Sequence, residues 1–327
     1  MENITSSNSF HFNSVRYSGI KSGLNLIVLG AVHGNEICGT QAIEKIIDEL
    51  DTKKKVITSG SVTFVPITNP LAFSKKQRMG DRNLNRNLNP NLNPKYFEDY
   101  VANWLCPLLS EHNVLLDLHS FHSPGSPFAL IGPANNSGPL EPFKFAKQEE
   151  ELALKLGVKV FVDGWLDTYA RGVEYRCANK NDYPQNSQLQ NLDIHYGMGT
   201  TEFIRSKGGY GITLECGQHN DLSAPEVAYQ AISNSLLHLG LVDGPLPMGI
   251  SNYQCLRIIE VIDKLHEGDY FSQEWKSFDH VKAGQVIGTR HNGKKVFTND
   301  DVKIMFPNTQ ALPGNEWFYL AELSNRF

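Results

Sequence analysis

Short apolar segments alternate with amphipathic segments between residues 24 and 241, and this alternation limits the fold more than any other feature. Residues 24–32, LNLIVLGAV, form an apolar run bounded by glycines, which is typical of a strand buried on both faces of a sheet. From Ile37 to Leu50 apolar residues recur at helical spacing, which predicts an amphipathic helix. This alternation predicts an α/β fold in which helices cover both faces of a parallel or mixed sheet.

The same patterns predict further elements along the chain. Apolar runs of strand length occur at residues 61–67, 113–121, 158–164 and 209–216. Helical periods occur at residues 141–157 and 224–241, the second of which begins next to a proline, as helices often do.

The pattern changes after residue 249. Short β-type segments separated by Gly, Asn and Asp turns follow one another, and no helical period is present. We therefore expect a catalytic α/β domain at residues 1–249 and a β-rich domain at residues 250–327.

The bulk properties favour an enzyme-sized protein with a small-molecule partner. The chain has 327 residues, of which 40% are hydrophobic, and a formal net charge of -5. Nucleic acid and anionic membranes attract mainly Lys and Arg, so neither is an expected partner. The first residues lack the basic and apolar regions of a leader, no apolar run is long enough to span a membrane, and the five cysteines form no C-x-x-C pair. These features predict a cytoplasmic protein with reduced thiols.

A histidine and a glutamate follow the first predicted strand, in the sequence HGNE. His33 and Glu36 stand at the start of the predicted helix, and His119 ends another apolar strand. Catalytic zinc sites often combine histidines with one carboxylate, and open α/β sheets bind ligands at strand ends. The three residues predict a metal site, with helix capping or a core role as the alternative for each.

Two acidic residues belong to the same hypothesis. Asp117 precedes His119 by two residues, so both side chains leave the same face of the strand. Its carboxylate could hold the tautomer of a metal-binding histidine, although the sequence does not say which one. Glu215 ends the apolar run GITLE and is a candidate general base, with a buried salt bridge to an arginine as the alternative.

Two further groups of residues have a functional and a structural interpretation. The loop at residues 75–88 contains Arg78, Arg82 and Arg86, which suit a substrate carboxylate but also fit a basic surface loop. Cys216 and His219 lie close in sequence and could form a thiol nucleophile with its base. A small buried cysteine is the commoner explanation.

These motifs together resemble the succinylglutamate desuccinylase/aspartoacylase family, a branch of the zinc carboxypeptidase superfamily. The matching segments are HGNE, an arginine followed by NLNR, DLH and TLE, in that order along most of the chain. The resemblance implies a zinc carboxypeptidase-like mixed sheet flanked by helices, with a small C-terminal all-β domain. It also implies one zinc ion per chain, bound by His33, Glu36 and His119, with Glu215 as the general base.

The resemblance implies roles for substrate contacts as well. Arg78 would polarise the scissile carbonyl, and Asn85 with Arg86 would hold the substrate's α-carboxylate. Arg205 falls where aspartoacylases carry an arginine for a second carboxylate, and Tyr319 matches a tyrosine that the β-rich domain contributes to the site.

Two positions depart from the family pattern. Asn83 replaces the acid of the family's DLNR, which affects one supporting contact. Thr201 replaces a tyrosine that aspartoacylases carry shortly before the substrate arginine, so the substrate of aspartoacylase cannot be copied to this chain.

The sequence therefore predicts a zinc-dependent hydrolase that cleaves the amide bond of a small N-acyl amino acid bearing more than one carboxylate. A zinc carboxypeptidase acting on peptides is the alternative enzyme. A binding module with a structural zinc is disfavoured, because structural zinc usually has four protein ligands rich in cysteine. The acyl group, the amino acid, the pathway, the metal in the cell and the oligomeric state, a homo-oligomer included, are left open.

Overall fold

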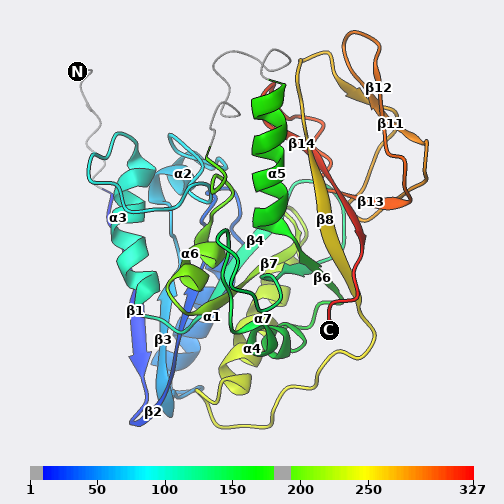
Figure 1. The fold of residues 1–327 in the computed structure, drawn as a ribbon. Helices are drawn as coiled ribbons and strands as arrows, with labels where there is room; N and C mark the ends of the chain where they lie inside the picture. The colour runs from blue at the N-terminus through cyan, green and yellow to red at the C-terminus, as the bar shows by residue number, and fades with distance from the viewer. Residues whose placement is uncertain (1–9, 180–192) are drawn as a thin grey trace.

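A single mixed sheet of eleven strands organises the protein (Figure 1). The computed structural model describes residues 10–179 and 193–327. The strand order is β1-β3-β2-β4-β7-β5-β6-β8-β14-β13-β10, and β12, β11 and β9 form a separate antiparallel sheet. The strands are β1 (Val15–Ser18), β2 (Lys21–Leu29), β3 (Ser59–Val65), β4 (Val114–Phe121), β5 (Phe128–Leu130), β6 (Val160–Asp163), β7 (Tyr210–Gln218), β8 (Gln254–Asp263), β9 (Tyr270–Phe271), β10 (His280–Val281), β11 (Val286–Thr289), β12 (Lys295–Phe297), β13 (Val302–Met305) and β14 (Glu316–Leu323).

Helices cover both faces of the part of the sheet that holds β2, β4 and β7. None of the helices in residues 10–179 and 193–327 is long and apolar enough to cross a bilayer. The helices are α1 (Cys38–Asp51), α2 (Pro70–Lys75), α3 (Phe97–Ser110), α4 (Ala146–Ala153), α5 (Trp165–Ala178), α6 (Thr200–Ser206) and α7 (Ala224–His238).

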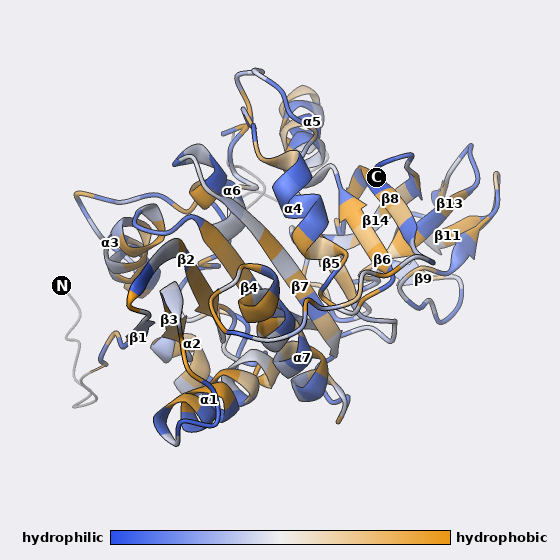
Figure 2. Ribbon diagram, turned by 90° about the horizontal axis from the view of Figure 1, so that it is seen from below, coloured by the Kyte–Doolittle hydropathy of each residue, from blue (hydrophilic) through white to orange (hydrophobic). Residues whose placement is uncertain are grey.

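The central strands are apolar at successive positions because they pack on both sides. Leu26 and Val28 of β2 join a core with α1, α4 and α7, whereas Ile27 and Leu29 join a core with α3 and α6. Successive side chains of a strand point to opposite faces, so a strand with two covered faces is apolar throughout. Figure 2 shows these strands mostly in the colours of apolar residues and α1 with both apolar and polar residues. The α/β fold predicted from the alternation is confirmed.

The β-rich C-terminal part continues the sheet. β8 pairs with β6 in parallel, and β14, β13 and β10 follow by antiparallel pairing. Trp317 and Phe318 of β14 are buried in a core of their own, on which the small sheet of β9, β11 and β12 packs. All elements assigned after residue 250 in the described chain are strands. The division between residues 249 and 250 stays a prediction, because one sheet runs across it.

Five helices differ from the sequence-based expectation. The helix predicted at residues 141–157 is shorter, as α4 spans only Ala146–Ala153. Phe143 instead forms a β-bridge with Asn136, and Gly157 adopts a positive φ of 89° after the helix. The helical periods did not predict α2, α3, α5 or α6. In α3 an internal proline, Pro107, interrupts the pattern that normally identifies a helix.

Leu116→Ala should lower the free energy of unfolding by about 2–5 kcal/mol, because Leu116 is fully buried in the central strand β4 and its truncation leaves a cavity. Urea denaturation would measure the change. Leu323→Ala is the matched control, since Leu323 is 72% exposed in β14 and its truncation should change stability little. Equal effects of the two substitutions would contradict the assigned core.

Candidate active site

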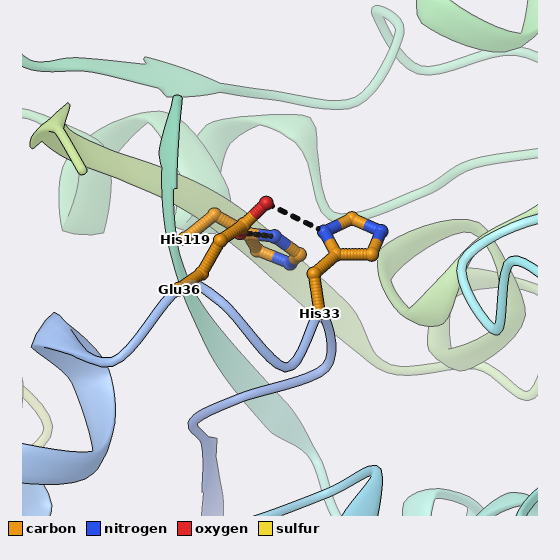
Figure 3. Close-up of side chains that lie close together, drawn as sticks. All are labelled: His33, Glu36 and His119. Atoms are coloured by element: carbon orange, nitrogen blue, oxygen red, sulfur yellow. Dashed lines mark hydrogen bonds and ion pairs between the residues drawn. The ribbon is translucent and has the colours of Figure 1, made fainter. Parts of the chain in front are cut away.

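The three residues of the predicted metal site meet at the carboxyl ends of two neighbouring strands. β2 and β4 run parallel, with Leu29 opposite Asp117. The loop that follows β2 and carries His33 and Glu36 therefore lies beside His119 near the end of β4. Figure 3 shows the three side chains turned toward one another from these two segments. All three are at least 98% buried.

Glu36 bridges the two imidazoles. Its Oε1 lies 2.9 Å from Nδ1 of His33, and its Oε2 lies 2.8 Å from Nδ1 of His119. One donor atom from each residue lies within 4.8 Å of the others, as the ligands of a single ion must. Nδ1 of His33 makes no hydrogen bond despite its closeness to Glu36, so a buried donor atom is left unsatisfied. These donors fit a divalent cation that accepts histidine nitrogen and carboxylate oxygen.

Gly34 lets the HGNE loop adopt its path. A Cβ atom at this position would lie 1.9 Å from the carbonyl carbon of Ala72 in α2, a contact that no side chain can tolerate. The loop therefore packs directly on the backbone of α2, and His33 and Glu36 are held on either side of that contact.

Asn83 and Asp117 contact the two histidines at Nε2, the ring nitrogen that does not face Glu36. Oδ1 of Asn83 lies 3.1 Å from Nε2 of His33, and Oδ2 of Asp117 lies 2.9 Å from Nε2 of His119. An acceptor at Nε2 favours the tautomer with its proton there and leaves Nδ1 free for a metal. Asn83 replaces the acid of the family's DLNR, and its amide oxygen contacts His33. Asp117 faces the histidine on its own strand and accepts a hydrogen bond from the hydroxyl of Thr200.

The protonation of the three groups suits metal binding. Burial, with the charge of Arg78, lowers the pKa of His33 to about 4, so this imidazole is neutral at pH 7. Burial would raise the pKa of Glu36, but the two histidines outweigh it and hold that pKa well below its usual range. The site therefore combines a carboxylate with a neutral histidine, and a cation at the centre would also displace any proton on His119.

Glu215 lies on the strand next to His119. β4 and β7 run parallel, with His119 opposite Glu215, and both side chains leave the same face. Oε2 of Glu215 is buried without a hydrogen-bond partner. Burial raises the pKa of this carboxyl to about 8, and a divalent cation beside it would lower that pKa again. The salt-bridge alternative finds no support, since Glu215 forms no ion pair within the described residues.

A cavity of about 290 Å³ opens above these strand ends. Its size suits a small molecule. Arg78 lies at this cavity with its side chain half exposed, and its NH1 donates to Oε1 of Glu36 over 2.9 Å. The other predicted site residues that line the cavity are His33, Asn85, Arg86, His119, Arg205, Glu215 and Tyr319.

Arg86 is buried in a network that the sequence did not suggest. Its NH2 donates to Oε1 of Glu316 and to the hydroxyl of Tyr169, and the latter also contacts the hydroxyl of Tyr319 at 2.5 Å. Nε of Arg86 has no partner within the described chain. Asn85 accepts a hydrogen bond from the backbone of Thr200. Burial opposes ionisation of Glu316, but the charge of Arg86 prevails and lowers its pKa to about 2.

Arg205 lies at the end of α6 and is engaged by the protein. Its Nε donates to Glu149, its NH1 donates to Glu141 and Glu202, and its NH2 donates to the carbonyl oxygen of Gly211. Three ion pairs and one hydrogen bond to a backbone carbonyl therefore account for these contacts without a substrate.

Other cavity residues were missed from the sequence. Glu316 stands three residues before Tyr319 in β14, so regular alternation would put their side chains on opposite faces of the strand. A bulge between the two residues breaks this alternation, and the sequence gives no sign of it. His219 also lines the cavity, with Nδ1 2.8 Å from Oγ of Ser120. Cys216 lies in the core shared with α1 and α7, and burial raises its pKa well above the usual range, which argues against a thiol nucleophile.

Comparison with known proteins bears on the fold and on the catalytic domain. The large mixed sheet with flanking helices and a small C-terminal antiparallel sheet is the predicted fold class, and solved structures share it. Residues 22–136 match the family model described as the succinylglutamate desuccinylase/aspartoacylase catalytic domain. This match to a catalytic domain agrees with the resemblance seen in the motifs and indicates an amide hydrolase. A comparison with curated proteins gives no match.

Solved structures share the fold over nearly the whole chain. A succinylglutamate desuccinylase/aspartoacylase from Rhodobacter sphaeroides has a TM-score of 0.70 at 16% identity, covering 96% of this chain and 89% of its own. The product-bound ectoine utilization protein EutE (DoeB) from Ruegeria pomeroyi has a TM-score of 0.67 at 16% identity, covering 94% and 88%. Succinylglutamate desuccinylase from Vibrio cholerae has a TM-score of 0.62 at 19% identity, covering 92% and 82%.

Gly34→Ala should weaken zinc binding by about tenfold or more, the scale at which misplaced ligands or their supports act, because the new Cβ would push the HGNE loop away from Ala72. Competition with a zinc-binding dye would measure the affinity. Gly138→Ala is the control, since its Cβ would meet only the side chain of Asn136, at 3.1 Å. Wild-type affinity in Gly34→Ala would show that the loop tolerates the shift.

Proposed function

We propose that the protein is a zinc-dependent deacylase that hydrolyses the amide bond of a small N-acyl amino acid. The observation that carries the proposal is the unpartnered carboxylate of Glu215 beside His119, in a cavity that also holds the three metal donors. A buried carboxylate without a partner is costly, so its presence at a cavity points to a chemical role. The match of residues 22–136 to the succinylglutamate desuccinylase/aspartoacylase catalytic domain supports the same reaction.

His33, Glu36 and His119 would hold the zinc ion, in agreement with their closely spaced donor atoms and the unsatisfied Nδ1 of His33. A zinc ion held by these residues would act as a Lewis acid and would lower the pKa of water to about 7. Asp117 and Asn83 would hold the imidazoles in the tautomer that presents Nδ1.

Glu215 would act as general base and then as general acid. Its carboxylate would take a proton from the attacking water and give it to the nitrogen of the departing amino acid as the amide bond breaks. The guanidinium of Arg78 is half exposed at the cavity and would donate to the oxygen of the scissile carbonyl as negative charge develops there. The products are a carboxylic acid and a free amino acid.

Arg86, with Asn85 and Tyr319, would bind the substrate's α-carboxylate. Nε of Arg86 is buried and unpartnered and can donate to a carboxylate oxygen. The hydroxyl of Tyr169 already donates to Glu316, and the hydroxyl of Tyr319 lies 2.5 Å from that of Tyr169, so Tyr319 would have to turn its hydroxyl from Tyr169 to the substrate. The five cysteines are free, which agrees with a cytoplasmic location as part of the same proposal.

Glu215→Gln should keep the zinc content of the wild type and lower kcat by at least ~10²-fold, the scale of a lost general base. The amide is close in size to the carboxylate but cannot take the proton from water. Metal analysis and kinetic assays on the same preparation would separate the two effects. Glu226→Gln on the exposed face of α7 is the control and should leave both values unchanged. Undiminished turnover in Glu215→Gln would remove the base assignment.

A panel of acyl amino acids tests the reaction itself. The zinc-loaded protein should release amino acid from N-acetyl, N-formyl or N-succinyl amino acids, and treatment with a chelator should abolish the release until zinc is restored. Short peptides with a free C-terminus belong in the same assay. Cleavage of the peptides alone would favour the carboxypeptidase alternative and reject the deacylase.

A further inference from the structure

A cluster with more negative than positive charge lies at the cavity wall formed by α6, and two of its acids, Glu141 and Glu149, come from α4 and the segment before it. Arg205 is the basic residue of this wall, and it contacts the carboxylates of Glu141, Glu149 and Glu202 at 2.9–3.2 Å. Three carboxylates surround one guanidinium, so the group has an excess of negative charge when all of its members are ionised. Glu202 and Arg205 both line the cavity.

Arg205 has no free pair of N–H groups for a substrate carboxylate. An arginine offers five N–H donors, and a carboxylate binds best to two that are adjacent. Nε donates to Glu149, both N–H groups of NH1 are used by Glu141 and Glu202, and NH2 donates to Gly211. At most one N–H remains. The residue is 5% exposed and lies against the backbone of Gly132, so it has little freedom to turn.

The acidic residues of the wall are themselves held in place. Glu202 accepts hydrogen bonds from the backbone N–H of Gly199 and from the hydroxyl of Thr201, which replaces the tyrosine of aspartoacylases. Burial raises the pKa of Glu141 to about 7, and the neighbouring carboxylates add to that effect. A second carboxylate brought to this wall would meet Glu202, which lines the cavity, and would find Arg205 already engaged by the protein.

An unpartnered polar group lies between this wall and the reaction centre. Thr213 stands on β7 two residues before Glu215 and faces the same side of the strand. It lines the cavity and is 94% buried, since its exposure is 6%, and within the described residues its hydroxyl forms no hydrogen bond. A polar substrate group that extends from the reaction centre along β7 would meet this hydroxyl and then Glu202.

The opposite side of the cavity has the reverse polarity once a metal is bound. A divalent cation and Arg78 would outweigh the charges of Glu36 and Glu215 there, so the acyl and α-carboxylate groups are favoured at that side. Charges arranged in this way select a substrate by complementarity.

We propose that the amino acid released by this enzyme carries a cationic side chain, so that the substrates are Nα-acyl derivatives of basic amino acids such as ornithine or lysine. Glu202 is the specificity-determining residue, and Arg205 orders the carboxylates around it instead of binding a second substrate carboxylate. The inference rests on the proposed deacylase function and names its substrate class.

The test compares side chains of similar length and different charge. Nα-acetyl-L-ornithine, Nα-acetyl-L-norleucine and Nα-acetyl-L-glutamate would be assayed with the zinc-loaded full chain, each also as its formyl and succinyl derivative. The kcat/KM of the ornithine compound should exceed that of the glutamate compound by at least ~10-fold, with norleucine between them, because tenfold corresponds to only about 1.4 kcal/mol of complementarity.

Glu202→Gln then tests the residue itself. Glutamine retains an oxygen that can accept from Gly199, and it removes the negative charge. The preference for ornithine over norleucine should fall by ~10-fold in this variant, the size expected when an opposite charge is removed. Glu151→Gln, on the exposed side of α4, is the control and should leave the preference unchanged.

The outcomes separate the two proposals. Hydrolysis in which glutamate or norleucine derivatives are preferred would overturn the basic-substrate inference and leave the deacylase proposal intact. A lack of hydrolysis with all nine compounds would reject both. The wild-type ranking decides the inference even if Glu202→Gln fails to fold, and an unchanged preference in a folded variant would reject the role of Glu202.

Discussion

The bridging carboxylate of Glu36 is the interaction on which the rest of the site depends. Its two oxygens approach the imidazoles of His33 and His119, and its Oε1 also accepts from Arg78. A carboxylate buried to this extent is stable only with positive charge beside it, supplied by Arg78, by a protonated His119 or by a cation. The contact of Gly34 with Ala72 and the supports from Asn83 and Asp117 hold the geometry that makes this compensation work.

The sheet positions the proposed chemistry through strand register. Because β2, β4 and β7 are parallel neighbours, their carboxyl ends bring the HGNE loop, His119 and Glu215 to one edge. Alternation along β7 assigns Thr213 and Glu215 to the cavity and Leu214 and Cys216 to the core with α1 and α7. A shift of one residue in this register would exchange the base with a thiol of the core.

Charge balance shapes the remainder of the cavity. Each arginine that lines it contacts a carboxylate: Arg78 contacts Glu36, Arg86 contacts Glu316, and Arg205 contacts three acids. Buried charges require such partners. The uneven distribution of these partners gives the α6 wall its negative character, and that distribution is the basis of the inferred preference for basic side chains.

The sequence by itself determined the alternation of strands and helices, the strand ends that carry His33, Glu36, His119 and Glu215, and the resemblance to a family. These features are local. A strand buried on two faces has a continuous apolar run, and a polar residue at the end of that run can be recognised in the sequence. Only the tertiary structure decided the partner of Asp117, the network of Arg86 with Glu316, and the three acids around Arg205. The spacing of Asp117 and His119 put both on one face of a strand but left the partner of Asp117 open, and Arg86 and Glu316 are 230 positions apart. These contacts depend on which strands pair and which helices pack, so the sequence alone did not settle them.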